Sequence, residues 1–452
     1  MKLKIILYGG ILVIITCSAC KKYLDAKSNK SLVIATKISD YQALLDNNTI
    51  MNRVSPSNGE GSADNYYLNY SDWDALYNDA YKNIYVWGDE ITYDLFPNDW
   101  GQAYDQVYFC NNVLEGLDVI QKDSSNANEW DNAEGSAFFF RANAFLKLVL
   151  TWANAYDSAT AGKEPGIPLR LNTDFNEVSV RATIQDCYNQ VLNDAEQAVN
   201  LLPVNALFAT RPSKAAAYGL IARTCLAMRN YTRAGLYADS CLQLNHTLID
   251  YNTLNTAASY PIAIFNAEMI FYAGAFGAEL SNSIANIDTV LLASYSDSDL
   301  RKTIFFKDRG NGTFGFKGSY NGNNSLFTGI AVDEMYLIRA ECYARENNAA
   351  SALNDLNTLL QNRWKKGTYI PYETNDAQQA LNRVLEERRK ELPFRDLRWM
   401  DLKRLNKEPG RQVTITRLLN GAVYTLPPND PRYALPIPAT VIELTGMQQN
   451  PR

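Results

Sequence analysis

The sequence predicts a mainly α-helical protein, in which helical hairpins form a scaffold and a long insertion forms an irregular, loop-rich second lobe. Apolar residues recur at spacings of three and four along most of the chain, which is the period of an amphipathic helix. Two distant segments, 211–244 and 333–363, repeat a helix–turn–helix plan. By contrast, residues 243–330 lack a long helical period and end near the Gly/Asn-rich stretch "RGNGTFGFKGSYNGNNS".

Single helices are predicted ahead of the first hairpin. Two are expected to begin near residues 70 and 100, a third covers about 132–156, and a fourth runs from Thr183 to Pro203. One face of each of the first two is marked by spacing: Tyr70, Trp73, Tyr77, Tyr81 and Tyr85 in the first, and Trp100, Tyr104, Val107, Asn111 and Leu114 in the second. Rings at such spacing are typical of a core, and we expect Trp73, Tyr77, Tyr81 and Tyr104 to be buried.

The two hairpin segments share alanine-rich helices. In "RPSKAAAYGLIARTCLAMRNYTRAGLYADSCLQL" the turn passes through Asn230 and Tyr231, and in "DEMYLIRAECYARENNAASALNDLNTLLQNR" it passes through Asn347 and Asn348. Small side chains let two helices approach closely, as in tetratricopeptide-type hairpins. Long insertions separate the units, so they are degenerate and do not predict a continuous solenoid.

Composition excludes some functions. The net charge of -6 argues against a nucleic-acid binder, because binding to phosphates requires a cationic surface. The chain has one histidine, His246, so neither a His-based zinc site nor a Ser-His-Asp triad is favoured. Five cysteines beyond residue 20 fall within helical patterns and are expected to be buried thiols.

The first twenty residues, "MKLKIILYGGILVIITCSAC", resemble a bacterial lipoprotein signal. A short basic start precedes an apolar run too short to span a membrane, and small residues precede Cys20. We expect a signal peptide over 1–19 and a lipid anchor to the membrane on Cys20; the alternative is a secretory signal without lipid. A single domain is expected over 20–452, with the helical scaffold at about 70–242 and 330–406 and the insertion at about 243–329.

Two motifs of other function classes are not favoured. "GNGTFG" at 310–315 fits the pattern of a dinucleotide-binding loop, but turn-forming residues follow it where that site requires a helix. Acidic pairs such as Asp94 with Asp99, or Asp297 with Asp299, could suggest glycoside hydrolysis, which needs carboxyls facing each other across a cleft. We expect no enzyme activity, no cofactor and no metal site.

Aromatic side chains indicate a binding site. Twelve of the residues from Tyr66 to Tyr104 are Tyr, Trp or Phe. Those without a helical face to bury them are expected to be exposed, where a ring with an apolar face and a polar tip suits a sugar or a peptide. The candidate ligand-binding residues of this kind are Tyr66, Tyr67, Trp87 and Tyr93, and Tyr320 and Asn321 of the insertion are added to them. Trp100 is a further candidate, but it begins a helix, so both a core role and a binding role are open for it.

Several segments, taken in order, resemble the SusD/RagB-like family of outer-membrane nutrient-binding lipoproteins. They include "CKKYLDAKSNKSL", "WGQAYDQVYFCNNVLEGLD", "EGSAFFFRANAFLKLV", "EMYLIRAECYAR" and the ending "YALPIPATVIELTGMQQNP". The resemblance implies a SusD-like fold and a cell-surface lipoprotein of the outer membrane. It also implies capture of an oligosaccharide or a peptide and its delivery to a SusC-like TonB-dependent transporter. The alternative is a tetratricopeptide-type scaffold of a surface complex without its own small ligand.

A dense charge cluster lies in "VLEERRKELPFRDLRWMDLKRL", residues 384–405, with seven Lys/Arg and five Asp/Glu. We interpret it as a structural ion-pair network in which Arg388, Arg395 and Arg398 pair with carboxylates that are close in sequence or that the bend brings near. Glu386 and Lys390 are spaced to pair along one helix, which Pro393 ends. Segments of this form are scaffold elements in the family that the chain resembles.

Overall fold

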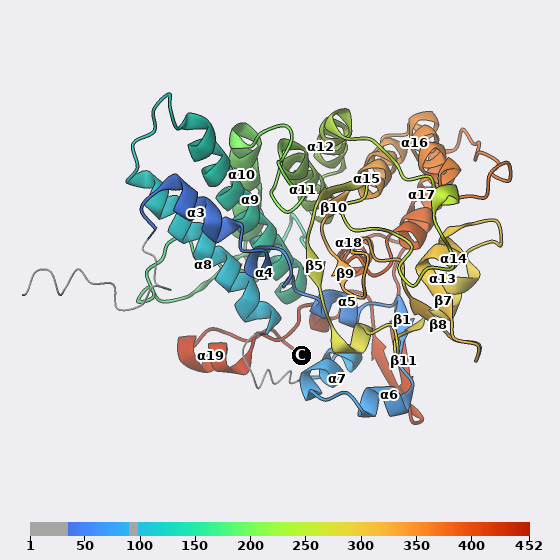
Figure 1. Cartoon of the computed structure of the whole chain (residues 1–452). Coiled ribbons are helices and arrows are strands. Elements are labelled where there is room, and N and C mark those ends of the chain that lie inside the picture. Colours follow the sequence, from blue (N-terminus) through green and yellow to red (C-terminus); the bar gives the residue numbers. More distant parts are fainter. Residues whose placement is uncertain (1–34, 90–97) are drawn as a thin grey trace, which may run out of the picture.

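The structure is a computed structural model that describes residues 35–89 and 98–452. Helices dominate it, which confirms the predicted mainly α fold (Figure 1). The longer helices are α3 (Ile38–Leu45), α7 (Asp79–Val86), α8 (Asp99–Asp118), α9 (Ala127–Trp152), α10 (Ile184–Leu201), α11 (Lys214–Ala227), α12 (Tyr231–Leu244), α15 (Val332–Arg345), α16 (Ala349–Gln361), α17 (Ala377–Glu391) and α18 (Arg398–Leu405). The shorter ones are α4 (Asn48–Met51), α5 (Asn58–Ser62), α6 (Tyr70–Asp74), η2 (Tyr251–Thr253), η3 (Ala278–Leu280), α13 (Thr289–Ala293), α14 (Arg301–Phe305), η4 (Pro431–Tyr433) and α19 (Ala439–Thr445).

The scaffold is a row of antiparallel helices. α9 packs against α8 and α10, and α11, α12, α15, α16 and α17 follow, each against its neighbour (Figure 1). Thr183 accepts a hydrogen bond from the backbone N–H of Asp186 and so begins α10 as predicted. The predicted hairpins are confirmed as α11/α12 and α15/α16.

Glycine lets two scaffold helices touch. A Cβ atom added at Gly235 of α12 would lie 2.9 Å from the Cβ of Cys342 on α15. All five cysteines that the structure describes are free and buried in helices, as expected. The second hairpin therefore packs against the first through side chains small enough for close contact.

The two hairpin turns have the same geometry. Asn230 and Asn348 each cap the second helix, with the side-chain oxygen accepting from a backbone N–H three residues on. The residue before each asparagine has a positive φ, 59° at Arg229 and 61° at Asn347. Asparagine tolerates this left-handed conformation, whereas arginine rarely adopts it.

The insertion between the hairpins contains most of the short strands and a second apolar core. Its paired strands are β4 (Met269–Phe271) with β10 (Ile330–Ala331), β5 (Gly274–Ala275) with β9 (Leu326–Phe327), and β7 (Phe306–Asp308) with β8 (Phe314–Phe316). Others are β1 (Tyr66–Tyr67) with β6 (Asn286–Ile287), β2 (Pro165–Pro168) with β3 (Arg181–Thr183), and β11 (Ile415–Leu419) with β12 (Ala422–Leu426). The "GNGTFG" glycines lie in and after the β7–β8 turn, where no helix begins.

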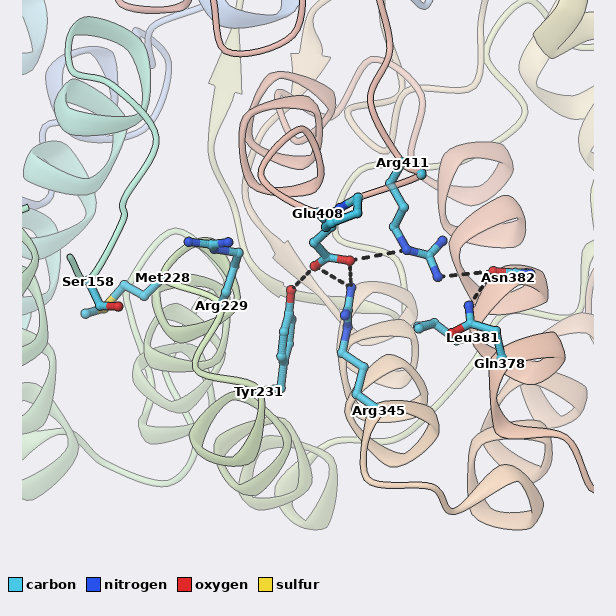
Figure 2. Close-up of a pocket in the computed structure, with 12 residues that line it drawn as sticks. Ser158, Met228, Arg229, Tyr231, Arg345, Gln378, Leu381, Asn382, Glu408 and Arg411 are labelled. Atoms are coloured by element: carbon cyan, nitrogen blue, oxygen red, sulfur yellow. Dashed lines mark hydrogen bonds and ion pairs between the residues drawn. The ribbon is translucent and has the colours of Figure 1, made fainter. Parts of the chain in front are cut away.

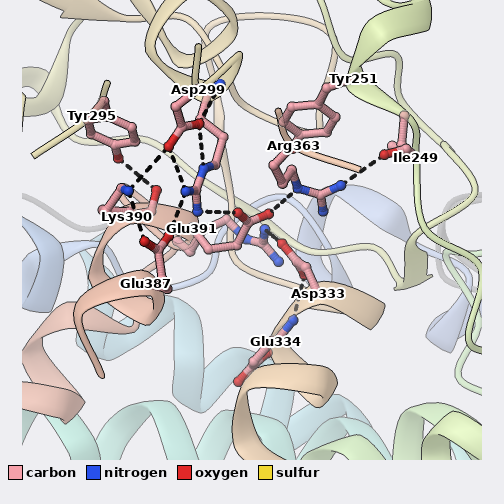
Figure 3. Close-up of polar contacts among 12 residues, drawn as sticks. Ile249, Tyr251, Tyr295, Asp299, Asp333, Glu334, Arg363, Glu387, Lys390 and Glu391 are labelled. Atoms are coloured by element: carbon pink, nitrogen blue, oxygen red, sulfur yellow. Dashed lines mark hydrogen bonds and ion pairs between the residues drawn. The ribbon is translucent and has the colours of Figure 1, made fainter. Parts of the chain in front are cut away.

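The charge cluster of 384–405 is a buried ion-pair network, as interpreted. Figure 3 shows the part of it where Glu387, Lys390 and Glu391 lie beside Asp299. Arg388 pairs with Asp401 at 2.8 Å, after the bend as expected. The expectation of nearby partners is wrong for the other two, since Arg395 pairs with Asp333 at 3.0 Å and Arg398 with Asp64 at 2.6 Å, both distant in sequence. The network extends to the insertion, because buried Arg301 bonds to Asp299, Glu387 and Glu391. It therefore joins the second lobe to the scaffold.

One predicted pair within that cluster is wrong. Lys390 donates to Glu387 at 2.9 Å and lies 3.2 Å from Asp299, whereas Glu386 pairs with Arg383. Lys390 is buried and Glu386 is exposed, so the two side chains lie on different sides of α17 and cannot pair.

The predicted helix through Tyr70 and Tyr85 is also wrong. Two short helices, α6 and α7, replace it, and Asn78 caps the second by accepting from the N–H of Ala80 at 2.8 Å. Because the helical register restarts at this cap, the aromatic spacing no longer defines one face. Tyr85 is buried, but Tyr77 is 79% exposed.

Candidate functional site

A polar cavity of about 230 Å³ lies where α7 and the start of α8 meet the loop before α5 and the loop after β5. Amide side chains are prominent in its lining, and two aromatic rings complete it. The amide-lined cavity, as we call it, is formed by Arg53, Val54, Ser55, Asn58, Asn78, Ala80, Tyr81, Ile84, Asn98, Asp99, Gln102 and Phe276.

Helix starts position two of its asparagines. Asn78 begins α7, and Asn98 begins α8 by accepting from the N–H of Gly101 at 2.9 Å. The amide nitrogen of Asn98 is buried and has no hydrogen-bond partner. A buried donor without a partner is costly, and a ligand oxygen in the cavity would satisfy it.

Asp99 supplies a carboxylate to this cavity. Its side chain accepts from the backbone N–H groups of Ser57 at 2.6 Å and Asn58 at 3.1 Å, which holds the loop before α5 against α8. Burial raises the pKa of Asp99 to about 6, although these two hydrogen bonds lower it. The group can therefore accept a hydrogen bond from a ligand hydroxyl at neutral pH.

Glu279 lies next to the lining residues and is fully buried. Neither of its carboxyl oxygens has a hydrogen-bond partner, and burial raises its pKa to about 8. A Cβ atom added at Gly61 would lie 2.3 Å from one of these oxygens, so the glycine makes room for the carboxyl. The negative charge of Asp99 raises the pKa of Glu279 further.

Aromatic rings form the rim. Phe276 is 57% exposed, and Tyr81 is half-buried with its ring centroid 5.7 Å from that of Tyr77 in an edge-on arrangement. Amides beside exposed rings can bind a ligand that has both hydroxyls and an apolar face.

The expected exposure is wrong for four of the candidate ligand-binding residues, because Tyr66, Trp87, Tyr320 and Asn321 are each 1% exposed. Trp100, for which both a core role and a binding role were open, is also buried. Tyr67 is half-buried, and Tyr93 lies outside the residues that the structure describes. None of the six described residues lines the amide-lined cavity. A ring without an open face cannot stack on a ligand in this conformation.

The buried candidates have structural partners. The indole N–H of Trp87 donates to the carbonyl of Ser62 at 3.0 Å, and the Tyr66 hydroxyl donates to Gly61 at 2.7 Å. Tyr320 donates to Glu268 at 2.6 Å within the ion-pair network. Asn321 holds its own loop through the carbonyl of Leu326.

Trp100 packs edge-on against Trp152 and lines a separate cavity of about 250 Å³ with Tyr104 and Phe175. It therefore faces away from the amide-lined cavity, although Asp99 beside it belongs to that cavity.

Sequence reasoning missed most of the lining residues. Asn78 and Asn98 each precede an aspartate and a helical segment, which is a helix-start signal. If Asn78 is taken as a helix cap, the aromatic pattern is divided between two helices. The spacing then no longer predicts that Tyr77 and Tyr81 are buried. Phe276 carries no local signal, because only the path of the insertion brings it to α7.

No group of three metal-ligating side chains is present among residues 35–89 and 98–452. Within the same ranges, the helices are all too short or too polar to cross a membrane. His246 belongs to no such group. Cys20, the expected lipidation site, lies outside the described part of the chain.

Solved structures share this fold over nearly the whole chain. A SusD superfamily protein from Bacteroides thetaiotaomicron has a TM-score of 0.75 at 19% identity, over 92% of this chain and 100% of that one. A putative sugar binding protein from Bacteroides vulgatus has a TM-score of 0.73 at 18% identity, over 93% and 99%. A SusD-like carbohydrate binding protein from Bacteroides vulgatus has a TM-score of 0.68 at 20% identity, over 91% and 97%.

Sequence comparison identifies the family. Residues 22–226 match a SusD-like family described as "Starch-binding associating with outer membrane", and residues 317–452 match the SusD family. No curated protein matches the chain. The chain belongs to the SusD/RagB-like family, which confirms the resemblance inferred from its sequence.

Proposed function

We propose that this protein is a nutrient-binding lipoprotein of the outer membrane that binds an oligosaccharide in the amide-lined cavity. The cavity carries the proposal: Asn58, Asn78, Asn98 and Gln102 surround it beside the rim ring of Phe276. Sugar hydroxyls pair with amides and a carboxylate, while the apolar face of a sugar ring packs on an aromatic ring. The family description and the names of the similar structures support a carbohydrate over a peptide.

The lipid anchor on Cys20 and a SusC-like TonB-dependent transporter complete the proposal. The anchor would hold the protein at the cell surface, and the transporter would receive the captured oligosaccharide. No catalytic step is proposed, because the amides, the rings and the single lining carboxylate of Asp99 bind rather than cleave. A purely structural scaffold, the second candidate, predicts that no glycan binds this cavity.

Two substitutions in the cavity are expected to weaken glycan binding. Phe276→Ala removes the exposed ring, and Gln102→Ala removes an amide from the lining. Each should weaken the affinity for a retained glycan about ten-fold, since a ring or a hydrogen bond is worth roughly 1 kcal/mol or more. Native mass spectrometry of the soluble form that begins after Cys20, mixed with an oligosaccharide pool, measures this.

Phe265→Ala is the matched control. Phe265 is 56% exposed, nearly the same as Phe276, but it does not line the cavity. Glycan binding that survives both cavity substitutions would place the site elsewhere. Binding of no glycan at all would favour the scaffold function.

A further inference from the structure

A second, larger cavity of about 780 Å³ lies among the scaffold helices (Figure 2). The α11–α12 turn, the last residue of α15, one side of α17 and the loop after α18 surround it. Its lining residues are Ser158, Met228, Arg229, Tyr231, Arg345, Gln378, Leu381, Asn382, Glu408, Pro409, Gly410 and Arg411. None of them lines the amide-lined cavity. We call this second site the arginine cavity.

Positive charge exceeds negative charge in this lining. The lining holds Arg229, Arg345 and Arg411 but one carboxylate, that of Glu408. Two further carboxylates lie just behind the lining, since Arg345 also pairs with Glu341 at 2.9 Å and Arg229 lies 3.9 Å from Asp157. Glu408 accepts from the hydroxyl of Tyr231 at 2.5 Å and lies 2.9 Å from Arg345 and 3.2 Å from Arg411, as Figure 2 shows. The whole chain carries a net charge of -6, so this excess of cations is local.

Among the three arginines that line this cavity, Arg229 has the weakest partners. Its Nε atom is buried without a hydrogen-bond partner, and its guanidinium lies 3.9 Å from the nearest paired carboxylate, Asp157. Lys407 also contacts that carboxylate, at 3.7 Å. A guanidinium has a rigid fork of donors that matches a carboxylate, so Arg229 can accept an additional anion.

The backbone at Arg229 supports a role for its side chain. The equivalent turn of the second hairpin has Asn347 at the same positive φ, where asparagine is well tolerated. Arginine is disfavoured at such a position, and its presence there indicates that the guanidinium contributes something that the turn itself does not need.

The aromatic content of the arginine cavity is unsuited to a sugar. Tyr231 is the one aromatic ring in its lining, and the Arg345 guanidinium lies 3.9 Å from the centroid of that ring. Arg345 thus covers a ring face on which a sugar would stack, and the Tyr231 hydroxyl is bound to Glu408. Side chains with carboxylates fit this lining better than neutral sugars do.

An adjoining cavity of about 450 Å³ shares Gly410 and Arg411 with the arginine cavity. Its cations have partners already, since Arg398 and Arg389 both contact Asp64. Its apolar lining comes from Val290, Leu291, Leu385 and Leu405. Ser294 and Glu386 also line it, and the Glu386 carboxylate pairs with Arg383 at 2.9 Å. A carboxylate site that continues into an apolar one fits a peptide with an acidic residue and an apolar residue further along the segment.

We propose that the arginine cavity and the adjoining apolar cavity bind an acidic peptide segment of a partner protein. An Asp or Glu side chain pairs with Arg229, and a Leu or Ile side chain further along the segment packs against Leu385 and Leu405. Stacked helical hairpins provide extended surfaces that repeat proteins use for binding. This surface is an addition to the proposed glycan site and does not depend on it.

Fluorescence anisotropy with two synthetic peptides tests the proposal on the soluble form that begins after Cys20. One peptide is labelled Gly-Glu-Leu-Glu-Leu-Gly, and the other has glutamine in place of each glutamate. The acidic peptide is expected to bind and to lose affinity as salt rises. Arg229→Asn should weaken it about ten-fold or more, because one charge-assisted pair is lost. Asparagine suits the positive φ, so the turn is preserved.

Arg233→Gln is the matched control, since Arg233 lies one turn further along the same hairpin and outside both cavities. It should leave peptide affinity unchanged. Equal binding of the acidic and amide peptides, equal loss in the two variants, or no binding of the acidic peptide would overturn the proposal. Binding of glucuronate with the same loss in Arg229→Asn, in place of the peptide, would also overturn it in favour of a sugar acid.

Discussion

Replacing Arg301 with methionine is expected to lower the free energy of unfolding by roughly 3–5 kcal/mol, the usual cost of removing one partner from a buried ion pair. Arg301 is fully buried and donates to three carboxylates, with distances of 2.7 Å to Asp299, 2.6 Å to Glu387 and 2.9 Å to Glu391. Lys390 also contacts Asp299 and Glu387, and Arg363 pairs with Glu391 but shares its charge with Glu268, so two cations would remain for four buried carboxylates. The variant would leave negative charge uncompensated in the interior.

Urea denaturation followed by circular dichroism measures this loss. Lys302→Met is the control, because Lys302 is next in sequence and its partner Asp297 is 95% exposed at the side chain. An exposed pair contributes about 0–1 kcal/mol, so the control should resemble the wild type. A similar small loss in both variants would show that Arg301 does not link the second lobe to the scaffold as its contacts indicate.

Glu279→Gln is expected to change how stability depends on pH. Burial raises the pKa of Glu279 from its ordinary value of 4.5 to about 8. Between these two pH values the folded protein keeps a proton that the unfolded chain releases, so this group makes the wild type less stable as pH rises. The variant lacks that contribution, and its stability relative to the wild type should increase by about 3–4 kcal/mol from pH 5 to pH 8.

Thermal or urea unfolding at pH 5, 6, 7 and 8 measures the difference. Glu60 and Asp99 also have raised pKa values, about 7 and about 6, because they are buried. They remain in both proteins, so their contribution largely cancels in the comparison. The exposed Glu443→Gln variant should run parallel to the wild type at every pH. A constant difference between Glu279→Gln and the wild type would mean that Glu279 is ionised in the folded protein throughout this range.

Helix periodicity predicted long elements well where a segment carries its own start and stop. α10 begins at Thr183 and the two hairpins turn at asparagines, since these signals act within a few residues. The same reasoning failed between Tyr70 and Tyr85, where Asn78 starts a new helix within one aromatic pattern. Spacing alone cannot show that a helix has been interrupted.

Burial of the aromatic residues could not be predicted in the same way. Trp87 and Tyr66 have no helical face, yet both are buried, with α5 hydrogen-bonded to each ring and the insertion paired with the strand of Tyr66. Tyr77 has a helical pattern, yet nothing covers it. Covering surfaces come from residues distant in sequence, so exposure of a ring is a property of the assembled fold.

The sequence by itself determined the helical scaffold, the family and the presence of a buried charge network at 384–405, because local periodicity, capping and motif order carry this information. Only the tertiary structure decided which carboxylates the arginines meet, since Asp64 and Asp333 pair with Arg398 and Arg395 across the fold. It also decided where the cavities lie. Each cavity is lined by segments far apart in the chain, such as Asn58 with Phe276 or Arg229 with Arg411, and only chain packing brings them together.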